Sequence, residues 1–341
     1  MQYRTFPGTT ITVSEIGLGV WTIGDDWWGH IPDDEGRAMI RHALDLGINF
    51  FDTSNTYGQG RAERLMGEAL KGVPRDRYVI AAKFGYDIHT EHARSGQRER
   101  PHRWELDFIR ESLEESLQRI RTDYVEHYLL HNPRMDAIRN DEIFETLEDL
   151  KHEGKILGYG VAMGPRIGWL EESIEAIRTR DIQNAQMIFN LLEQEPGRAI
   201  ISVAEEERVG LMVRVPTSSG MLEGIYDENT VFPPTDHRSH RERKWLIEGL
   251  QKARKVAFLQ ERYGDTPTQS AYRYVLSFPI VMSVTPNFTS REQMTEAAAM
   301  SDGRSFTADE LQWLSEQYDQ NFGIEASDDV RKLVAAPAHQ N

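Results

Sequence analysis

Residues 43–70 read ALDLGINFFDTSNTYGQGRAERLMGEAL and contain the pattern that decides the fold. A short apolar run, Ile48 to Asp52, is followed after a polar loop by helical periodicity from Ala62 to Leu70. A short apolar run that leads into a helix is typical of a βα unit of a parallel sheet. We therefore interpret this stretch as one strand and its crossover helix.

The same unit recurs along the chain. Besides Ile48 to Asp52, the predicted strands are Ile16 to Val20, Tyr78 to Lys83, Tyr124 to Leu130, Ile156 to Val161, Ala185 to Phe189, Gly210 to Val215 and Ile280 to Val284. The predicted helices are Asp33 to Gly47, Ala62 to Leu70, Leu106 to Arg121, Asp141 to Glu153, Gly168 to Thr179, Gly197 to Arg208 and a double helical stretch from Arg243 to Ser277. Eight units can close into a cylinder that leaves no strand edge exposed. The pattern therefore predicts an α/β fold of the (β/α)8 or TIM-barrel type rather than a doubly wound sheet.

Additional elements are predicted at both ends of the barrel sequence. Tyr3 to Phe6 and Thr10 to Val13 flank Pro7-Gly8-Thr9, which predicts a β-hairpin that caps the bottom of the barrel. Helical periodicity from Phe306 to Tyr318 predicts an extra helix after it. No linker or low-complexity segment marks a boundary, so we expect residues 1–341 to form one domain.

Composition excludes several classes of protein. The 341 residues include 55 acidic and 39 basic side chains, for a net charge of −16, which argues against a nucleic-acid-binding surface. The chain has no cysteine, so disulfides, thiolate metal sites and a cysteine nucleophile are excluded. Neither a secretion signal nor a long apolar run is present, so we expect a cytoplasmic protein that does not bind membranes. The sequence does not indicate an oligomeric state.

Three connections are longer than barrel closure requires: residues 21–32, 84–103 and 216–240. Each follows a predicted strand, so all three should open onto the top face of the barrel. Barrel enzymes keep their active sites on that face.

Charged or ionisable side chains end three consecutive predicted strands. Asp52, Lys83 and His131 each follow a buried apolar run, and Tyr57 lies five residues after Asp52. A charge at such a position is costly unless it is paired. A single residue of this kind is more often an ordinary ion pair or cap, but four at one face favour catalysis. We expect Lys83 to lower the pKa of the Tyr57 phenol, Asp52 to hold Lys83 charged, and His131 to orient a substrate oxygen.

The sequence resembles the aldo-keto reductase family, in particular bacterial members related to potassium-channel β subunits. The resemblance covers nearly the whole chain and rests on IGLGVWTIG (16–24), the stretch 43–70, AAKFG (81–85) and ESLEESLQRIRTDYVEHYLLH (111–131). It implies a tetrad of Asp52, Tyr57, Lys83 and His131 and a nicotinamide dinucleotide bound across the top of the barrel.

The resemblance also implies cofactor contacts, although the match is uneven. QMIFN suggests Gln186 for the nicotinamide carboxamide and Phe189 for stacking on the ring, while Ala162-Met163 replaces the family's Ser-Asn pair. VPTSSGMLEGIY (215–226) resembles the loop over the pyrophosphate. The contacts implied by that loop are Ser218, Ser219, Gly220 and Leu222.

The adenosine side departs further from the family pattern. In SVTPNFTSREQMTEAAA (283–299), Gln293 is retained, but Thr289 replaces the usual arginine and Ala297 replaces an asparagine. Arg291 or the basic run HRSHRERK (237–244) is a candidate substitute, and a solvated helix start is the plainer interpretation of that run. The resemblance favours NADP(H), while these losses leave NAD(H) as an alternative.

The first and second long loops carry candidate substrate contacts. Trp21, Trp27, Trp28 and Tyr86 predict an aromatic wall, although each tryptophan is equally suited to packing its loop onto the barrel. His89 and His92 have a spacing compatible with a metal site, but in a polar loop such a pair is ordinarily solvated, and we predict no metal.

The sequence therefore predicts an NAD(P)H-dependent oxidoreductase that reduces a small aldehyde or ketone to an alcohol, with Tyr57 as general acid. The alternative from another class is a cofactor-sensing binding or regulatory protein with slow or no turnover, which the altered residues 162–163 and 287–297 suggest.

Overall fold

The computed structural model describes residues 1–90, 99–164 and 169–335, and this part of the chain contains one eight-stranded sheet. Its strands are β3 (Leu18–Gly19), β4 (Phe50–Asp52), β5 (Val79–Phe84), β6 (Val125–His131), β7 (Ile156–Ala162), β8 (Asn184–Ile188), β9 (Gly210–Arg214) and β10 (Val281–Val284). Neighbours in sequence are neighbours in the sheet, and all pairs are parallel. Each of the eight predicted apolar runs contains one of these strands or overlaps it.

The sheet closes between its first and last strands. Ile16 forms a parallel bridge with Val284, and the backbone N–H of Gly17 donates to the carbonyl of Val284 at 2.7 Å. The N–H of Val284 donates in turn to the carbonyl of Glu15 at 2.9 Å. The predicted (β/α)8 barrel is therefore confirmed, and no edge of the sheet is left open at this seam.

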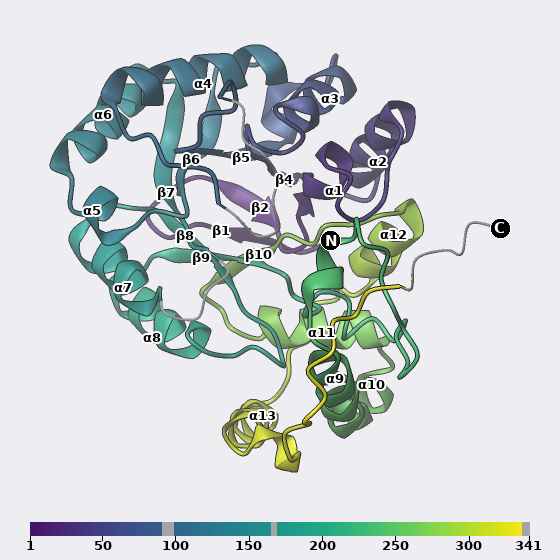
Figure 1. Ribbon diagram of the computed structural model, residues 1–341. Helices are drawn as coiled ribbons and strands as arrows, with labels where there is room; N and C mark the ends of the chain where they lie inside the picture. The colour runs from purple at the N-terminus through teal and green to yellow at the C-terminus, as the bar shows by residue number, and fades with distance from the viewer. Residues whose placement is uncertain (91–98, 165–168, 336–341) are drawn as a thin grey trace.

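Helices lie around the outside of the sheet (Figure 1). The longer ones are α2 (Asp33–Asp45), α3 (Arg61–Ala69), α4 (Leu106–Ile120), α6 (Asp141–His152), α7 (Leu170–Thr179), α8 (Gly197–Glu207), α9 (Arg243–Val256), α10 (Phe258–Tyr263), α11 (Pro267–Leu276), α12 (Arg291–Ala299) and α13 (Ala308–Asp319). Short turns of helix are α1 (Trp21–Gly24), α5 (Met135–Ile138), η1 (Arg75–Arg77), η2 (His237–His240) and η3 (Asn321–Gly323). No helix in the described residues combines the length and apolarity needed to cross a bilayer.

The double helical stretch predicted for residues 243–277 consists of three helices, α9, α10 and α11. Gly264 ends α10 in the left-handed conformation with φ of 71°. Thr266 then starts α11 with a capping box to Gln269 and Pro267 at its first position. The predicted tail helix is α13, which Thr307 and Glu310 cap in the same way.

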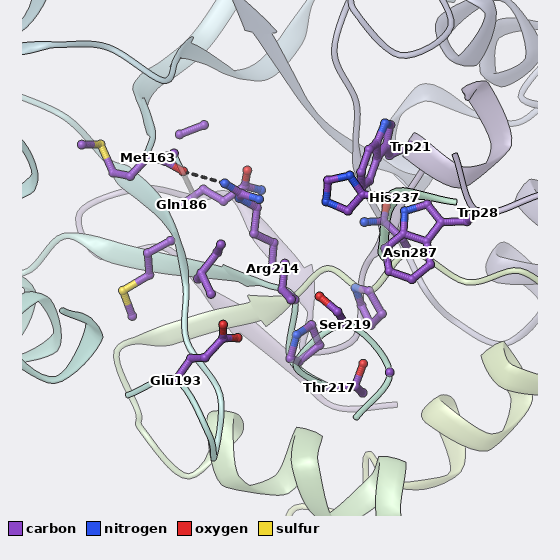
Figure 2. Close-up of a pocket in the computed structure, with 18 of the residues that line it drawn as sticks. Trp21, Trp28, Met163, Gln186, Glu193, Arg214, Thr217, Ser219, His237 and Asn287 are labelled. Carbon is purple, nitrogen blue, oxygen red and sulfur yellow. Dashed lines mark hydrogen bonds between the residues drawn. The ribbon is translucent and has the colours of Figure 1, made fainter. Parts of the chain in front are cut away.

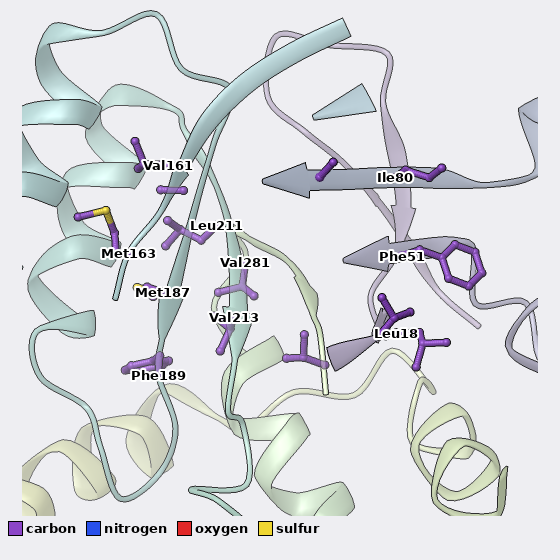
Figure 3. Packing of buried hydrophobic residues seen from close by; sticks show 14 of the residues in the cluster. Leu18, Phe51, Ile80, Val161, Met163, Met187, Phe189, Leu211, Val213 and Val281 are labelled. Atoms are coloured by element: carbon purple, nitrogen blue, oxygen red, sulfur yellow. The ribbon is translucent and has the colours of Figure 1, made fainter. Parts of the chain in front are cut away.

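Two apolar layers hold the barrel together. Side chains on the outer face of the strands, such as Phe51, Ile80, Val161 and Leu211, are buried between the strands and the helices (Figure 3). A second cluster fills the lower interior of the barrel: Phe6, Ile11, Val13, Phe50, Val79, Ala81, Leu129, Ala162, Met212 and Met282. Phe6, Ile11 and Val13 belong to the N-terminal hairpin of β1 (Tyr3–Thr5) and β2 (Thr12–Ser14), so the hairpin plugs the bottom as predicted.

Side-chain alternation along the strands places polar groups above this apolar plug. Phe50, Ala81, Leu129 and Met212 belong to the interior cluster. The residues two positions later on the same strands are Asp52, Lys83, His131 and Arg214. Because alternate residues of a strand share a face, these four should point into the upper interior.

Residues 325–335 cross the molecule near α9, and we call them the C-terminal strap. Val334 forms a parallel bridge with Phe232, and Lys332 forms an antiparallel bridge with Glu242. Leu333, 1% exposed, joins a small apolar cluster with Phe232 and side chains of α9. The strap therefore fixes the third long loop, residues 216–240, from outside.

Candidate active site

A cavity of about 930 Å³ opens at the carboxyl ends of the strands. Its lining comes from strand ends, including His131 and Arg214, and from each of the three long loops. A volume near the upper end of the ordinary range for ligand sites, about 300–1,000 Å³, suits a ligand larger than a simple aldehyde.

Of the four predicted tetrad residues, Tyr57 and His131 line this cavity, and the buried Lys83 and Asp52 lie behind Tyr57. The Lys83 Nζ donates to Asp52 Oδ1 at 2.6 Å, to the Thr53 carbonyl at 2.9 Å and to the Tyr57 hydroxyl at 3.2 Å. The rings of Tyr57 and His131 are 6.5 Å apart and nearly perpendicular. β4 and β5 are adjacent strands, so their ends bring Asp52 and Lys83 together without help from a loop.

In this group, burial and neighbouring charges shift the pKa values of Lys83 and Tyr57 in opposite directions. Burial lowers the pKa of Lys83, but the Asp52 charge and the Tyr57 contact raise it more, so the net pKa lies above its usual value. Burial raises the pKa of Tyr57, and this outweighs the lowering by Lys83 and Arg214. Lys83 does lower the pKa of Tyr57 as expected, but the net pKa of Tyr57 is raised because burial has the larger effect. The phenol is held protonated in the ligand-free protein.

His131, the fourth residue of the tetrad, is held neutral. Burial lowers its pKa well below the usual value, and the charges of Lys83 and Arg214 act in the same direction. Its Nδ1 lies 3.2 Å from the Ser54 hydroxyl. When Ser54 donates to Nδ1, the Nε2 carries the hydrogen and can donate it to a ligand oxygen.

The four predicted aromatic residues all line the cavity. Trp21 lies 6.1 Å from both Trp27 and Trp28 and 6.4 Å from Tyr57, measured between ring centroids. His237 from the third long loop packs among the tryptophans, 5.1 Å from Trp27 and 5.6 Å from Trp21 (Figure 2). The aromatic lining therefore comes from all three long loops, and the sequence of the first long loop does not predict the contact with His237.

The structure places half of the eight predicted cofactor contacts in the cavity lining. Gln186, Ser219, Gly220 and Gln293 line the cavity. Gly220 has φ of 90°, and a Cβ at this position would collide with the Tyr226 hydroxyl, so the turn requires glycine.

The other four predicted contacts lie outside the cavity lining. Phe189 is fully buried and stacks on Tyr274 at 5.3 Å. The Ser218 hydroxyl donates to Glu193, and Leu222 is packed in the core. Arg291 pairs with Glu35 at 3.0 Å on the surface. Phe189 is three residues beyond Gln186, so strand alternation turns its ring away from the cavity.

Arg214 is a charged cavity residue that the sequence analysis did not identify. It ends β9, and its Nη2 donates to the Met163 carbonyl at 2.9 Å (Figure 2). The signal was the one used for Asp52, Lys83 and His131, a charge at the end of an apolar run, here GLMVR.

The donor and acceptor set of the cavity fits a nicotinamide dinucleotide. Gln186 and Arg214 provide polar atoms beside the tetrad, and Thr217, Ser219 and Arg241 provide hydroxyls and a cation farther along the lining. The Arg241 Nε has no hydrogen-bond partner within the described chain. Amide, hydroxyl and phosphate groups of such a cofactor would meet complementary side chains.

The second long loop reaches the tetrad through its last residues. The His102 Nε2 is 3.0 Å from the His131 carbonyl, and Tyr86 is held by Glu99 and Asn132. His89 pairs with Glu115 at 2.9 Å. His92 lies outside the described residues, and within those that are described no group of three or more metal-ligating side chains occurs.

Comparison with known proteins gives one consistent result. The family described as "Aldo/keto reductase family" matches residues 15–319. Aldo-keto reductase YhdN of Bacillus subtilis is 29% identical over 288 residues, which is 82% of both chains. The NADH-specific methylglyoxal reductase of Escherichia coli is 26% identical over 303 residues, 86% of this chain and 91% of the relative. The solved structure of a glycerol dehydrogenase from Gluconobacter oxydans superposes with a TM-score of 0.80 and 26% identity, covering 96% of this chain and 98% of the other.

Proposed function

The chain belongs to the aldo/keto reductase family, and from that premise we propose that it reduces a small aldehyde or ketone to an alcohol with Tyr57 as the proton donor. Members of the family are oxidoreductases that use nicotinamide cofactors to reduce carbonyl compounds. The observation that carries the proposal is that Lys83 donates hydrogen bonds to both Asp52 and Tyr57, and that Tyr57 lines the cavity.

The proposed chemistry assigns each tetrad residue one task. A nicotinamide cofactor, when bound, would supply the hydride for the carbonyl carbon. Tyr57 donates a hydrogen bond to the carbonyl oxygen and gives up its proton as negative charge develops there. Lys83, 3.2 Å from the Tyr57 hydroxyl, stabilises the resulting phenolate, and Asp52 keeps Lys83 charged. His131 provides a second hydrogen bond to the same substrate oxygen.

The upward net pKa of Tyr57 is compatible with this task. A proton donor must be protonated before the reaction, and burial ensures that state at neutral pH. As charge moves onto the substrate oxygen, the ammonium of Lys83 becomes the nearest compensating charge. Its stabilising effect is therefore larger in the transition state than in the resting protein, which is the requirement for catalysis.

The aromatic wall supports a compact substrate with an apolar part. Trp21, Trp27 and Trp28 place aromatic rings in the lining with Tyr57, so we expect short aldehydes and ketones to be preferred over sugars with many hydroxyls. The E. coli relative whose name specifies methylglyoxal supports the same substrate class.

We propose NADP(H) as the cofactor, with Arg241 in place of the family arginine that is absent at Thr289. Arg291 is engaged by Glu35 outside the cavity lining, whereas Arg241 belongs to the lining. NAD(H) is the alternative, and Glu223 and Glu296 favour it because they also line the cavity and would repel a 2′-phosphate. Titration of protein fluorescence with NADPH and NADH decides between them.

Substitution of Tyr57 tests the proposed function. Tyr57→Phe should bind the cofactor with unchanged affinity but reduce carbonyl turnover by at least about a hundredfold, since the proton donor is lost. Tyr86→Phe is the matched control, because Tyr86 also lines the cavity but bonds to Glu99 and Asn132. Unchanged turnover in Tyr57→Phe contradicts the assignment. Tight cofactor binding by the wild type without turnover of any aldehyde would instead support the cofactor-sensing alternative.

A further inference from the structure

Arg214 places a guanidinium inside the mouth of the barrel. It lies two residues after Met212, which is buried in the barrel interior, and opposite Ile188 on the adjacent strand β8. Figure 2 shows its side chain beside Gln186, in the cavity lining. The position is therefore set by two paired strands rather than by a flexible loop.

This guanidinium has few partners in the protein itself. It makes one hydrogen bond, from Nη2 to the Met163 carbonyl at 2.9 Å. Within residues 1–90, 99–164 and 169–335, no carboxylate lies within ion-pair distance of it, and its Nε and Nη1 donate to no group. A guanidinium has five N–H donors, and the unused ones here are not among the buried atoms without a partner, so they face the cavity. The unused donors point to an acceptor on a ligand.

Gln186 offers the complementary atom. Its Nε2 donates to Asp52 Oδ1 at 3.0 Å. Because an ionised carboxylate only accepts hydrogen bonds, this contact fixes the amide orientation and leaves Gln186 Oε1 as the atom available to a ligand. The adjacent side chains Gln186 and Arg214 thus present one acceptor and several donors, which matches a primary carboxamide, with its NH₂ donor and its carbonyl acceptor.

The charges nearby oppose an anionic ligand at this place. Glu193 also lines the cavity, and its charge acts on Arg214. Asp52 is hydrogen-bonded to Gln186. A carboxylate or phosphate seated on Arg214 would be repelled by the Glu193 charge, whereas a neutral carbonyl oxygen would not, and the Asp52 charge is offset by its ion pair with Lys83. The surroundings therefore favour a neutral acceptor.

We propose that Arg214 is a cofactor-positioning residue that donates to the carboxamide oxygen of the nicotinamide while Gln186 accepts from its amide nitrogen. This inference rests on the proposed function. The carboxamide is attached to the ring next to the carbon that carries the hydride, so holding it beside Gln186 keeps that carbon close to Asp52, Lys83 and Tyr57. The cation also repels the positive charge of the oxidised ring, so Arg214 favours the reduced cofactor.

Equilibrium titrations of Arg214→Gln test the proposal without turnover. The probes are NADPH, NADP⁺ and 2′-phospho-ADP-ribose, which lacks the nicotinamide, or the NADH series if the wild type prefers it. We expect NADPH affinity to fall by at least about tenfold, because a hydrogen bond from a charged donor is lost. NADP⁺ affinity should fall less, and affinity for the nicotinamide-free probe should not change.

Three further measurements serve as controls. Arg100→Gln is the matched control, because Arg100 also lines the cavity and bonds to backbone carbonyls; it should leave the ratio of NADPH to NADP⁺ affinity unchanged. If Arg214→Gln does not fold, Arg214→Lys keeps the charge and should retain part of the affinity. The wild type alone should also bind the thionicotinamide analogue more weakly, since sulfur is a poor acceptor.

The outcomes that overturn the proposal are distinct. Equal loss of affinity for NADPH and the nicotinamide-free probe would place Arg214 on the phosphates. Unchanged affinity for all probes would overturn the role of Arg214 and leave the proposed function standing. If the wild type binds no nicotinamide nucleotide, the proposed function fails and this inference fails with it.

Discussion

Strand β6 carries two histidines on the same face, His127 and His131. His127 lies toward the closed lower end of the barrel and His131 toward the open upper end. His127 is fully buried, lies 4.5 Å from the Phe6 ring of the hairpin plug and contacts Asn184. His131, four residues later, lines the cavity next to Tyr57. Burial is the largest cause of a lowered pKa for both.

The two histidines show that burial alone does not identify a functional residue. Both histidines are held neutral, so a perturbed pKa does not distinguish the functional one. What differs is access, because the hairpin seals the lower end and the long loops leave the upper end open to ligands. The predictions below test that separation, beginning with the largest expected effect.

The first prediction concerns the charged pair at the open end. Lys83→Met should leave Asp52 buried without its partner, and loss of a buried partner costs about 3–5 kcal/mol of unfolding free energy. Turnover should fall by at least about a hundredfold, because the Tyr57 phenolate loses its compensating charge. Urea unfolding and steady-state kinetics measure the two effects.

A double substitution serves as the control for this pair. Lys83→Met combined with Asp52→Asn removes both charges and should recover most of the lost stability but none of the activity. Recovery of both, or of neither, would contradict the separate roles assigned to the pair.

The second prediction concerns the closed end and its dependence on pH. Burial lowers the pKa of His127 to about 3, whereas an exposed histidine has a pKa of about 6.5. Between these values the unfolded chain binds one more proton than the folded chain, so the unfolding free energy falls as pH falls. His127 should contribute about 1.4 kcal/mol per pH unit to this loss. Full stability from this group is present above about pH 6.5.

The variant His127→Gln isolates this contribution. In urea unfolding at pH 6, 5 and 4, the stability advantage of the wild type over His127→Gln should shrink by about 1.4 kcal/mol per unit. His152→Gln is the control for the same substitution at an exposed position. Parallel curves for the wild type and His127→Gln would show that His127 is protonated in the folded state.

The smallest expected effect concerns the hydrogen bond behind His131. Ser54→Ala removes the hydroxyl 3.2 Å from His131 Nδ1, so the ring loses its orienting contact while all tetrad residues remain. A lost neutral hydrogen bond of about 1 kcal/mol corresponds to a several-fold fall in kcat. The assay is carbonyl reduction at saturating cofactor, and a loss as large as that of Tyr57→Phe would mean that Ser54 has a direct role.

The barrel and the tetrad could be predicted from the sequence because each depends on local pattern. Short apolar runs reveal buried parallel strands, and a charge at the end of such a run is conspicuous. Asp52, Lys83 and His131 follow from this pattern together with the rule that strand ends converge on one face. The hairpin plug is similarly local, since its turn and two strands lie within residues 3–14.

The other features of the site could not be predicted, because they depend on the direction of side chains and on contacts between segments far apart in the sequence. Alternation from Gln186 turns Phe189 outward, and alternation from Met212 turns Arg214 inward, so both directions follow only once the inward face of each strand is known. His237 joins Trp21 across more than two hundred positions of sequence, and no local pattern indicates that contact. The net pKa direction of Tyr57 also requires the extent of burial, which a sequence does not supply.

The C-terminal strap sets the order in which the molecule can be completed during synthesis. Residues 325–335 hold the loop of residues 216–240, and that loop supplies His237 and Ser219 to the cavity. A nascent chain can close its barrel once β10 has left the ribosome, yet the rim of the cavity gains its outer support about forty residues later. The outer support of that loop is therefore the last part of the cavity rim to be made.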